Sequence, residues 1–189
     1  MAPQTNSITL DWQGSFDLAE LANISPEELT CPAVYFTHYP ADIFGKDLYY
    51  FGATKNLLAR IMNHNTNTLA GLYSVPNIAG NSAEKYELKP HQLLQQYADK
   101  EDIKKRALRF VDHLYETKMS YAFCDHDDAI HGIERFFISK FIELYGYECI
   151  INVDLRGCRK YKGTPILIEN KNSEIIEKLF GKTFTIPYG

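Results

Sequence analysis

The stretch that decides the fold is LYYFGATKNLLARIMNH, Leu48 to His64. It begins with an apolar run rich in aromatic residues, which predicts a β-strand followed by a glycine turn. Thr54 is expected to cap a helix over 55–65. Arg60 and His64 stand four residues apart in that helix, so their side chains lie next to each other at the margin of its apolar face. By itself this pattern indicates a strand, a turn and a helix, with a solvent-facing polar pair.

A second predicted strand precedes this stretch. AVYFTHY, Ala33–Tyr39, is rich in β-branched and aromatic residues and stops at Pro40. With the strand over 48–53 it forms a predicted hairpin, because only a short loop joins the two. Upstream, ISPEELT predicts a short helix: Ser25 can cap it, and a proline and a glutamate follow at the expected spacing.

The rest of the chain is more helical, and it ends in a further strand-helix-strand unit. The expected elements are a loop over 67–90, a helical pattern over 91–118, a strand over 119–124, a helix over 129–145, strands over 165–170 and 182–187, and a helix over 173–180. We therefore expect an α/β fold of the α+β kind, in which helices flank a small, mostly antiparallel central sheet and a helical insertion interrupts it. No linker splits the 189 residues into separate domains.

Composition excludes several classes of protein. Hydrophobic residues make up 45% of the chain and charged residues 23%, which is typical of a globular protein. No apolar run approaches the roughly 20 residues that span a bilayer, and no signal peptide is recognised at the start, so a cytoplasmic protein without membrane contact is expected. The four cysteines are scattered, which favours reduced thiols over disulfides or a zinc site.

The net charge of −4 argues against a protein that coats nucleic acid by bulk charge, but it permits a local basic patch. RGCRKYKG, residues 156–163, places Arg156, Arg159 and Lys160 around a tyrosine between two glycines. Such a loop suits contacts with phosphates and bases, and it equally fits an exposed surface turn. A second basic run, at 104–109, is interpreted as a solvated helix face.

Glu134 is the most informative single residue. On a helical wheel it falls inside the apolar face formed by Ile130, Ile133, Phe137, Phe141 and Leu144. A carboxylate there loses hydration, so it must be paired, hydrogen-bonded or bound to a metal. A structural ion pair with an arginine, or a position at the edge of the face that reaches solvent, would explain it as well as a metal site does.

The order of these features along the chain is more specific than any one of them. It runs as Ala33-Val34-Tyr35, Tyr50-Phe51-Gly52, then T-x-N-L-x-x-R-x-x-x-H as Thr54, Asn56, Leu57, Arg60 and His64, and finally Glu134 and Asn152. This arrangement resembles the GIY-YIG nuclease family, whose two tripeptides correspond to AVY and YFG. Ala33 replaces the first glycine and the tripeptides stand further apart than is usual, which implies a longer hairpin loop.

The resemblance divides the chain. Residues 33–154 correspond to a GIY-YIG-like nuclease domain, within which 66–118 form a helical insertion. Residues 1–32 are an N-terminal arm. The segment 155–189 is a C-terminal β-α-β extension that is expected to pack on the same domain. The arm, the insertion and the extension have no counterpart in the minimal family domain.

The resemblance also implies an activity, the metal-dependent hydrolysis of phosphodiester bonds in DNA, most simply double-stranded DNA, at a single active site. The implied catalytic residues are Tyr35, Tyr50, Arg60, His64 and Glu134. Glu134 would hold one Mg²⁺ or Mn²⁺ ion, and Arg60 would bind the phosphate oxygens. Tyr35 would orient the attacking water or act as general base, which requires a nearby cation to lower its pKa. Tyr50 and His64 would share proton transfer.

Further residues are implied in binding nucleic acid or phosphate. They are Gly52, Thr54, Lys55, Asn152, Arg156, Arg159 and Lys160. Gly52 would leave room for the scissile phosphate, and Asn152 would brace the site. A homodimer is possible in this interpretation, because one site cuts one strand at a time.

Three alternatives stay open. The first is a domain of the same fold that binds nucleic acid without cutting it. The second is a different metal site, since Asp125, His126, Asp127, Asp128, His131 and Glu134 crowd into one short segment and His131 and Glu134 are three residues apart on a helix. The third is a protein-interaction module with the insertion as its docking surface. Only the nuclease interpretation requires Tyr35, Tyr50, Arg60 and Glu134 to converge.

Overall fold

A six-stranded sheet organises the protein, with strand order β3-β2-β4-β1-β5-β6. The computed structural model describes residues 6–40, 47–69, 99–151, 163 and 165–186. The strands are β1 (Asn6–Asp17), β2 (Ala33–Tyr39), β3 (Leu48–Thr54), β4 (Lys118–Phe123), β5 (Ile166–Lys171) and β6 (Thr183–Ile186). The pairing of β1 with β5 is parallel and the other four pairings are antiparallel. The predicted α+β fold with a mostly antiparallel central sheet is therefore confirmed.

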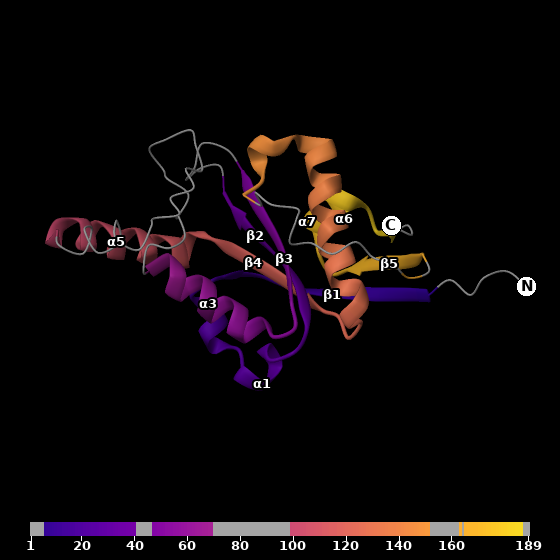
Figure 1. Cartoon of the computed structure of the whole chain (residues 1–189), viewed down its shortest axis with the longest axis horizontal. Coiled ribbons are helices and arrows are strands. Elements are labelled where there is room, and N and C mark those ends of the chain that lie inside the picture. The colour runs from indigo at the N-terminus through magenta and orange to yellow at the C-terminus, as the bar shows by residue number, and fades with distance from the viewer. Residues whose placement is uncertain (1–5, 41–46, 70–98, 152–162, 164, 187–189) are drawn as a thin grey trace, which may run out of the picture.

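Helices cover both faces of this sheet. They are α1 (Pro26–Leu29), α3 (Leu57–Leu69), α5 (Lys100–Glu116), α6 (Asp127–Tyr145) and α7 (Glu174–Phe180), with short 3-10 turns at Glu20–Asn23 and Tyr147–Cys149. In Figure 1, α6 stands upright to the right of the β2–β3 hairpin, α3 and α1 lie below it, and α5 extends to the left. None of the described helices combines the length and the apolar character needed to cross a membrane.

The sheet has an apolar core on each face. On the first face, Val34, Phe36 and Phe51 pack against α6 and α7, with Phe137 at the centre of an aromatic cluster. On the second face, a smaller core forms beneath α1 and α3; its buried members are Leu18, Leu21, Leu29, Ala33, Tyr35, Leu57, Met119 and Tyr121. Because side chains alternate along a strand, β2 sends Val34 to the first face and Tyr35 to the second.

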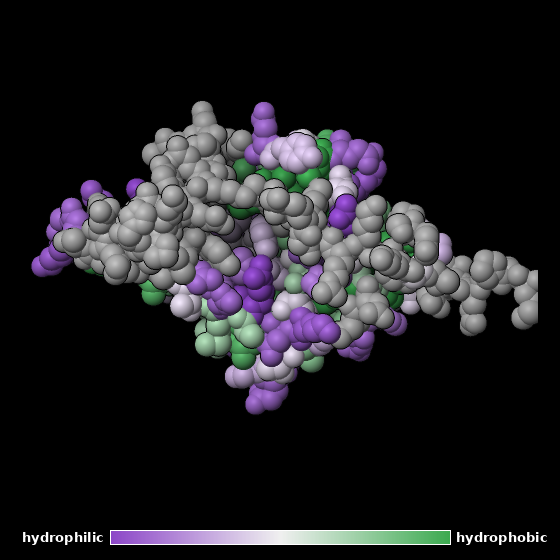
Figure 2. Space-filling view, viewed as in Figure 1, coloured by the Kyte–Doolittle hydropathy of each residue, from purple (hydrophilic) through white to green (hydrophobic). Residues whose placement is uncertain are grey.

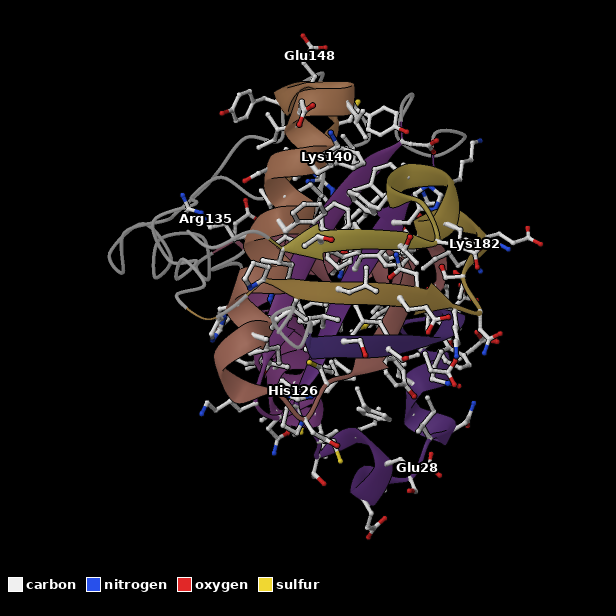
Figure 3. All side chains as sticks on the ribbon, turned by 90° about the vertical axis from the view of Figure 1, so that its right-hand side faces the viewer. Glu28, His126, Arg135, Lys140, Glu148 and Lys182 are labelled. Carbon is white, nitrogen blue, oxygen red and sulfur yellow. The ribbon has the colours of Figure 1, made fainter. Side chains whose placement is uncertain are left out.

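The long N-terminal strand β1 is not among the elements that the sequence analysis predicts. It lies between β4 and β5, and Ile8, Leu10 and Trp12 are buried in the first core while Ser7, Thr9 and Asp11 are exposed. Figure 3 shows β1 beside β5 and β6. The residues assigned to an N-terminal arm therefore supply an inner strand of the sheet, and the C-terminal strands join the sheet through it.

The ends of several helices differ from the prediction. Helix α3 starts at Leu57 and runs to Leu69, beyond the predicted end at 65 and into the segment assigned to a loop. The predicted helix over 91–118 is described from Lys100 to Glu116. Asp127 and Asp128 already belong to α6, which ends at Tyr145 as predicted. The short helix with Ser25 as its cap is confirmed, since the Ser25 side chain accepts a hydrogen bond from the Glu28 N–H.

Candidate active site

Arg60 joins two tyrosines from neighbouring strands. Its Nε–H donates to the hydroxyl oxygen of Tyr35 at 2.9 Å, and its Nη2 donates to that of Tyr50, also at 2.9 Å. The two rings lie 6.1 Å apart between centroids. Tyr35 comes from β2, Tyr50 from the edge strand β3 and Arg60 from α3, so three elements converge on one guanidinium.

Gly52 makes the packing of Tyr35 possible. The two residues are opposite each other in the β2–β3 pairing. A Cβ atom at position 52 would lie 2.3 Å from Cζ of Tyr35 and 2.4 Å from its hydroxyl oxygen, which is far inside van der Waals contact. The space beside Gly52 is therefore filled by the Tyr35 ring. The glycine therefore has a packing role beside Tyr35, and its role in leaving room for a phosphate stays a prediction.

The turn between β3 and α3 sets the direction of Arg60. The Thr54 hydroxyl accepts from the Asn56 N–H at 3.2 Å and donates to the Asn56 carbonyl at 3.0 Å, so it stabilises the turn. Asn56 is the residue that caps the helix, because its Oδ1 accepts from the Ala59 N–H at 2.8 Å. The predicted cap at Thr54 is wrong by two residues. Leu57 is fully buried and anchors the first turn of α3 on the sheet.

His64 lies one helical turn beyond Arg60 and makes an edge-to-face contact with Tyr50, with 5.5 Å between the ring centroids. Burial lowers the pKa of His64 to about 4, and the positive charge of Arg60 and the neighbouring His113 act in the same direction. The imidazole is therefore neutral at pH 7. A neutral imidazole in contact with the Tyr50 ring and close to the Arg60 guanidinium can accept a proton, although a pKa this low makes it a weak base.

Glu134 approaches from the other face of the sheet. It lies on α6, and only 13% of its side chain is exposed. Its carboxylate accepts a hydrogen bond from the backbone N–H of Ala53 on the edge strand β3 and contacts His131 Nδ1 through Oε2 at 3.2 Å. It also lies near enough to Arg60 to feel its charge. The edge of β3 thus carries the tyrosine-arginine group on one side and a carboxylate on the other.

Burial dominates the protonation of both acids in this site. It raises the pKa of Glu134 from its ordinary value, against smaller opposing effects from His131, the Ala53 N–H and Arg60. It also raises the pKa of Tyr35 well above 10, although Arg60 lowers it by charge and hydrogen bonding. The cation beside Tyr35 therefore does not produce the lowered pKa that a general base requires, and the phenol stays neutral at pH 7.

The structure brings together the five residues implied in catalysis, Tyr35, Tyr50, Arg60, His64 and Glu134, around the β3 edge. Lys55 is exposed in the turn before α3. Asn152, Arg156, Arg159 and Lys160 lie outside the described residues. Figure 2 shows hydrophilic residues over α3 and over α6 on the face that it presents.

Three groups at the site are not among the implied site residues. The Ala53 N–H carries no signal in a side-chain motif. His113, on α5, lies near enough to affect His64, is buried and contacts Thr117 Oγ1 through Nδ1 at 3.0 Å. His131 lies beside Glu134. Only His131 had a recognisable signal, its spacing of three residues from Glu134 on one helix.

The alternative metal site at the start of α6 includes Asp127 and Asp128, whose side chains lie outside the part of the chain that the structure describes. Among the described residues, no group of three or more histidine, cysteine, aspartate or glutamate side chains could hold a metal ion. Glu134 remains a suitable single anchor, because a carboxylate oxygen is the donor that Mg²⁺ and Mn²⁺ prefer, and such ions keep several waters. Comparison of the chain with family models, curated proteins and solved structures finds no match.

Proposed function

We propose that this protein is a metal-dependent endonuclease that hydrolyses phosphodiester bonds in DNA, and that double-stranded DNA is its substrate. The observation that carries the proposal is the single guanidinium of Arg60 hydrogen-bonded to Tyr35 and Tyr50, with Glu134 across the same strand edge. This is the convergence that the GIY-YIG resemblance requires and that an interaction module does not. It is supported by three short motifs and one distant helix meeting in space.

Arg60 supplies the positive charge for the phosphate. A guanidinium has five N–H donors, and the two hydrogen bonds to tyrosines described above leave three for phosphate oxygens. Burial lowers the pKa of Arg60 because it removes hydration, but the effects of Tyr35 and Tyr50 together raise the pKa by more. Arg60 therefore keeps its charge. Its tyrosine partners hold it rigid, and a preorganised donor stabilises charge in the transition state most effectively.

The two tyrosines act as neutral hydroxyl groups in this proposal. Because Tyr35 stays protonated, we assign it to orienting the attacking water rather than to removing its proton. Tyr50 accepts from Arg60 through its hydroxyl and packs against His64 through its ring. Neutral His64 is then the side chain of this group that can accept a proton.

Glu134 is the proposed metal ligand, and its carboxylate fits the role. It is mostly buried and is held by the Ala53 N–H and by His131, so its oxygens lie in a prepared position; because burial raises its pKa, a cation and a proton compete for it. A bound Mg²⁺ or Mn²⁺ ion would neutralise charge on the phosphate and stabilise the leaving oxygen.

The proposal extends to the setting of the reaction. With one active site a chain cuts one strand per visit, so a break in both strands requires a homodimer or two encounters. The alternative, a domain that binds nucleic acid without cutting it, would differ from the proposed nuclease only in that it leaves the bound DNA uncleaved. We propose a cytoplasmic location, in keeping with an enzyme that meets DNA there.

Plasmid cleavage tests the proposal. Supercoiled DNA is incubated with the wild type, Arg60→Ala and Glu134→Gln, in Mg²⁺, in Mn²⁺ and in EDTA, after circular dichroism has shown that each variant is folded. We expect nicked product from the wild type with either ion and none in EDTA. Both variants should lose at least about 100-fold in rate. Cleavage that survives both substitutions would refute the assignment of the site.

A further inference from the structure

His131 and Glu134 form a pair that the nuclease resemblance does not assign. They stand three residues apart on α6, so both side chains leave the helix on the same side. His131 Nδ1 and Glu134 Oε2 are 3.2 Å apart, while 34% of the His131 side chain and 13% of the Glu134 side chain are exposed. The pair is therefore partly shielded by protein and partly open to solvent.

The distance between the two atoms is the distance between two ligands of one ion. Ligands at right angles to each other and about 2.1 Å from a small divalent ion lie about 3 Å apart. Known helical metal sites also pair a carboxylate and an imidazole three residues apart, in the order Glu-x-x-His; here the spacing is the same and the order is reversed. Without a metal, a hydrogen atom lies between His131 Nδ1 and Glu134 Oε2 and forms a hydrogen bond, since two facing lone pairs would repel each other.

We propose that His131 Nδ1 and Glu134 Oε2 bind the same divalent ion, and that this imidazole ligand makes the site prefer Mn²⁺ to Mg²⁺. This inference rests on the proposed function in one respect, the assignment of Glu134 as a metal ligand. Imidazole nitrogen is a poor ligand for Mg²⁺ and a better one for first-row transition metals. Water molecules and the phosphate of the substrate would complete the coordination.

The neighbouring groups favour a cation with more than one protein donor. Glu134 also receives the Ala53 N–H and lies within the field of Arg60, so part of its negative charge is already compensated. A single compensated carboxylate binds a divalent ion weakly, and a second donor strengthens the site. Arg135 is the next residue on α6, and Figure 3 shows it on the side of the helix away from β1, β5 and β6.

Pulsed electron paramagnetic resonance of bound Mn²⁺ tests the proposal directly, because a nitrogen bonded to Mn²⁺ gives its own modulation. The variants are His131→Asn, whose amide can still donate a hydrogen bond to Glu134, and Glu134→Gln. His126→Asn is the matched control: His126 is exposed, lies at the N-terminal end of the same helix and makes no capping hydrogen bond with its side chain.

We expect an imidazole nitrogen signal in the wild type that changes when histidine is labelled with ¹⁵N. The signal should vanish in His131→Asn and persist in His126→Asn. In calorimetric titrations His131→Asn should weaken Mn²⁺ binding by about ten-fold or more, and Mg²⁺ binding by much less.

Two other results would overturn the proposal in distinguishable ways. If Mn²⁺ binds without a nitrogen signal and Glu134→Gln abolishes that binding, His131 is not a ligand, while the metal role of Glu134 in the proposed function survives. If Glu134→Gln binds Mn²⁺ as the wild type does, or if the wild type binds none, both the paired site and the metal role of Glu134 fail.

Discussion

Arg60 holds two hydroxyl groups through two different nitrogen atoms, a task that suits the planar guanidinium and not an ammonium group. We therefore expect Arg60→Lys to fold but to lose at least about 100-fold in cleavage rate, because a lysine cannot hold both tyrosines and a phosphate at once. The rate is measured on labelled duplex DNA with enzyme in excess.

Arg109→Lys is the matched control for this substitution, since Arg109 is exposed on α5. It should leave the rate within about two-fold of the wild type. Equal rates for Arg60→Lys and Arg109→Lys would show that the charge alone matters and that the fork to the tyrosines does not.

Gly52 is the second residue whose replacement has a definite consequence. A Cβ atom there would overlap the Tyr35 ring, so Gly52→Ala should lower the free energy of unfolding by about 1–3 kcal/mol. Combining it with Tyr35→Leu, which removes the end of the ring, should recover part of that loss, and urea unfolding of the four proteins measures the coupling. Additive effects would contradict the proposed contact.

At the residue scale, the sequence predicts which residues belong to the site better than it predicts their protonation. The order of Tyr35, Tyr50, Arg60 and Glu134 along the chain is enough to group them. The raised pKa of Tyr35 could not be predicted, because it depends on how deeply β2 is buried beneath α3, and burial outweighs the nearby charge. The cap is assigned to Thr54 rather than Asn56, because both are good capping residues two positions apart.

At the scale of helices and strands, the contact between α3 and α5 makes the stability of the fold sensitive to acid. His64 on α3 and His113 on α5 both have their pKa lowered to about 4, mainly by burial. The unfolded chain therefore binds more protons than the folded one below about pH 6.5, the usual histidine pKa. Stability is complete above that pH and falls as the pH drops toward 4.

Urea unfolding between pH 7.5 and 4 measures this effect. Each histidine contributes a slope of up to about 1.4 kcal/mol per pH unit in that window, so His64→Gln should flatten the curve by up to that amount. His38→Gln is a suitable comparison, because His38 lies on β2, away from this pair, and faces Asp47. Identical slopes for the wild type and His64→Gln would contradict the buried, neutral state of His64.

The elements were predicted well wherever their signal is local. The β2–β3 hairpin and α6 follow from strand propensity and helical periodicity within short windows. The predicted end of helix α3 is too early, because Asn65, Thr66 and Asn67 are weak helix formers. In the structure these three residues are nevertheless helical. Thr68 is buried, so tertiary packing overrides the propensity, and its hydroxyl donates to the His64 carbonyl one turn earlier in the same helix.

At the scale of the whole molecule, the N-terminal strand β1 joins the C-terminal strands β5 and β6 to the rest of the sheet, because it lies between β4 and β5. Trp12, the single tryptophan, lies on β1 and donates from Nε1 to Asn170 Oδ1 on β5 at 3.1 Å. Phe180 on α7 also packs against Phe51 and Phe137. The C-terminal strands thus share the core of the β2–β3 hairpin.

We therefore expect one cooperative unfolding transition for the sheet. The fluorescence of Trp12 reports on the β1–β5 junction, and far-ultraviolet circular dichroism reports on the helices. Their midpoints in urea should coincide, because both probes lie on one core. Two separated midpoints would show that the C-terminal strands unfold independently of the hairpin.

The central position of β1 could be predicted from the sequence only in part. Its alternation of buried Ile8, Leu10 and Trp12 with exposed residues is a strand pattern and could have been recognised. The strands that pair with β1 in the sheet could not be predicted from the sequence. The β4 and β5 partners lie far along the chain, and pairing between such distant segments depends on the packing of the entire core.

If residues from both sides of the β3 edge cut DNA together, loss of one of them should separate DNA binding from DNA cleavage. Glu134→Gln and the wild type are incubated with the same labelled duplex in Mn²⁺ and in Mg²⁺, and bound and cleaved fractions are measured in parallel. We predict that Glu134→Gln binds the duplex within about two-fold of the wild type but cleaves it at least about 100-fold more slowly. Binding without cleavage by the wild type, or equal cleavage by both proteins, would contradict the proposed nuclease site.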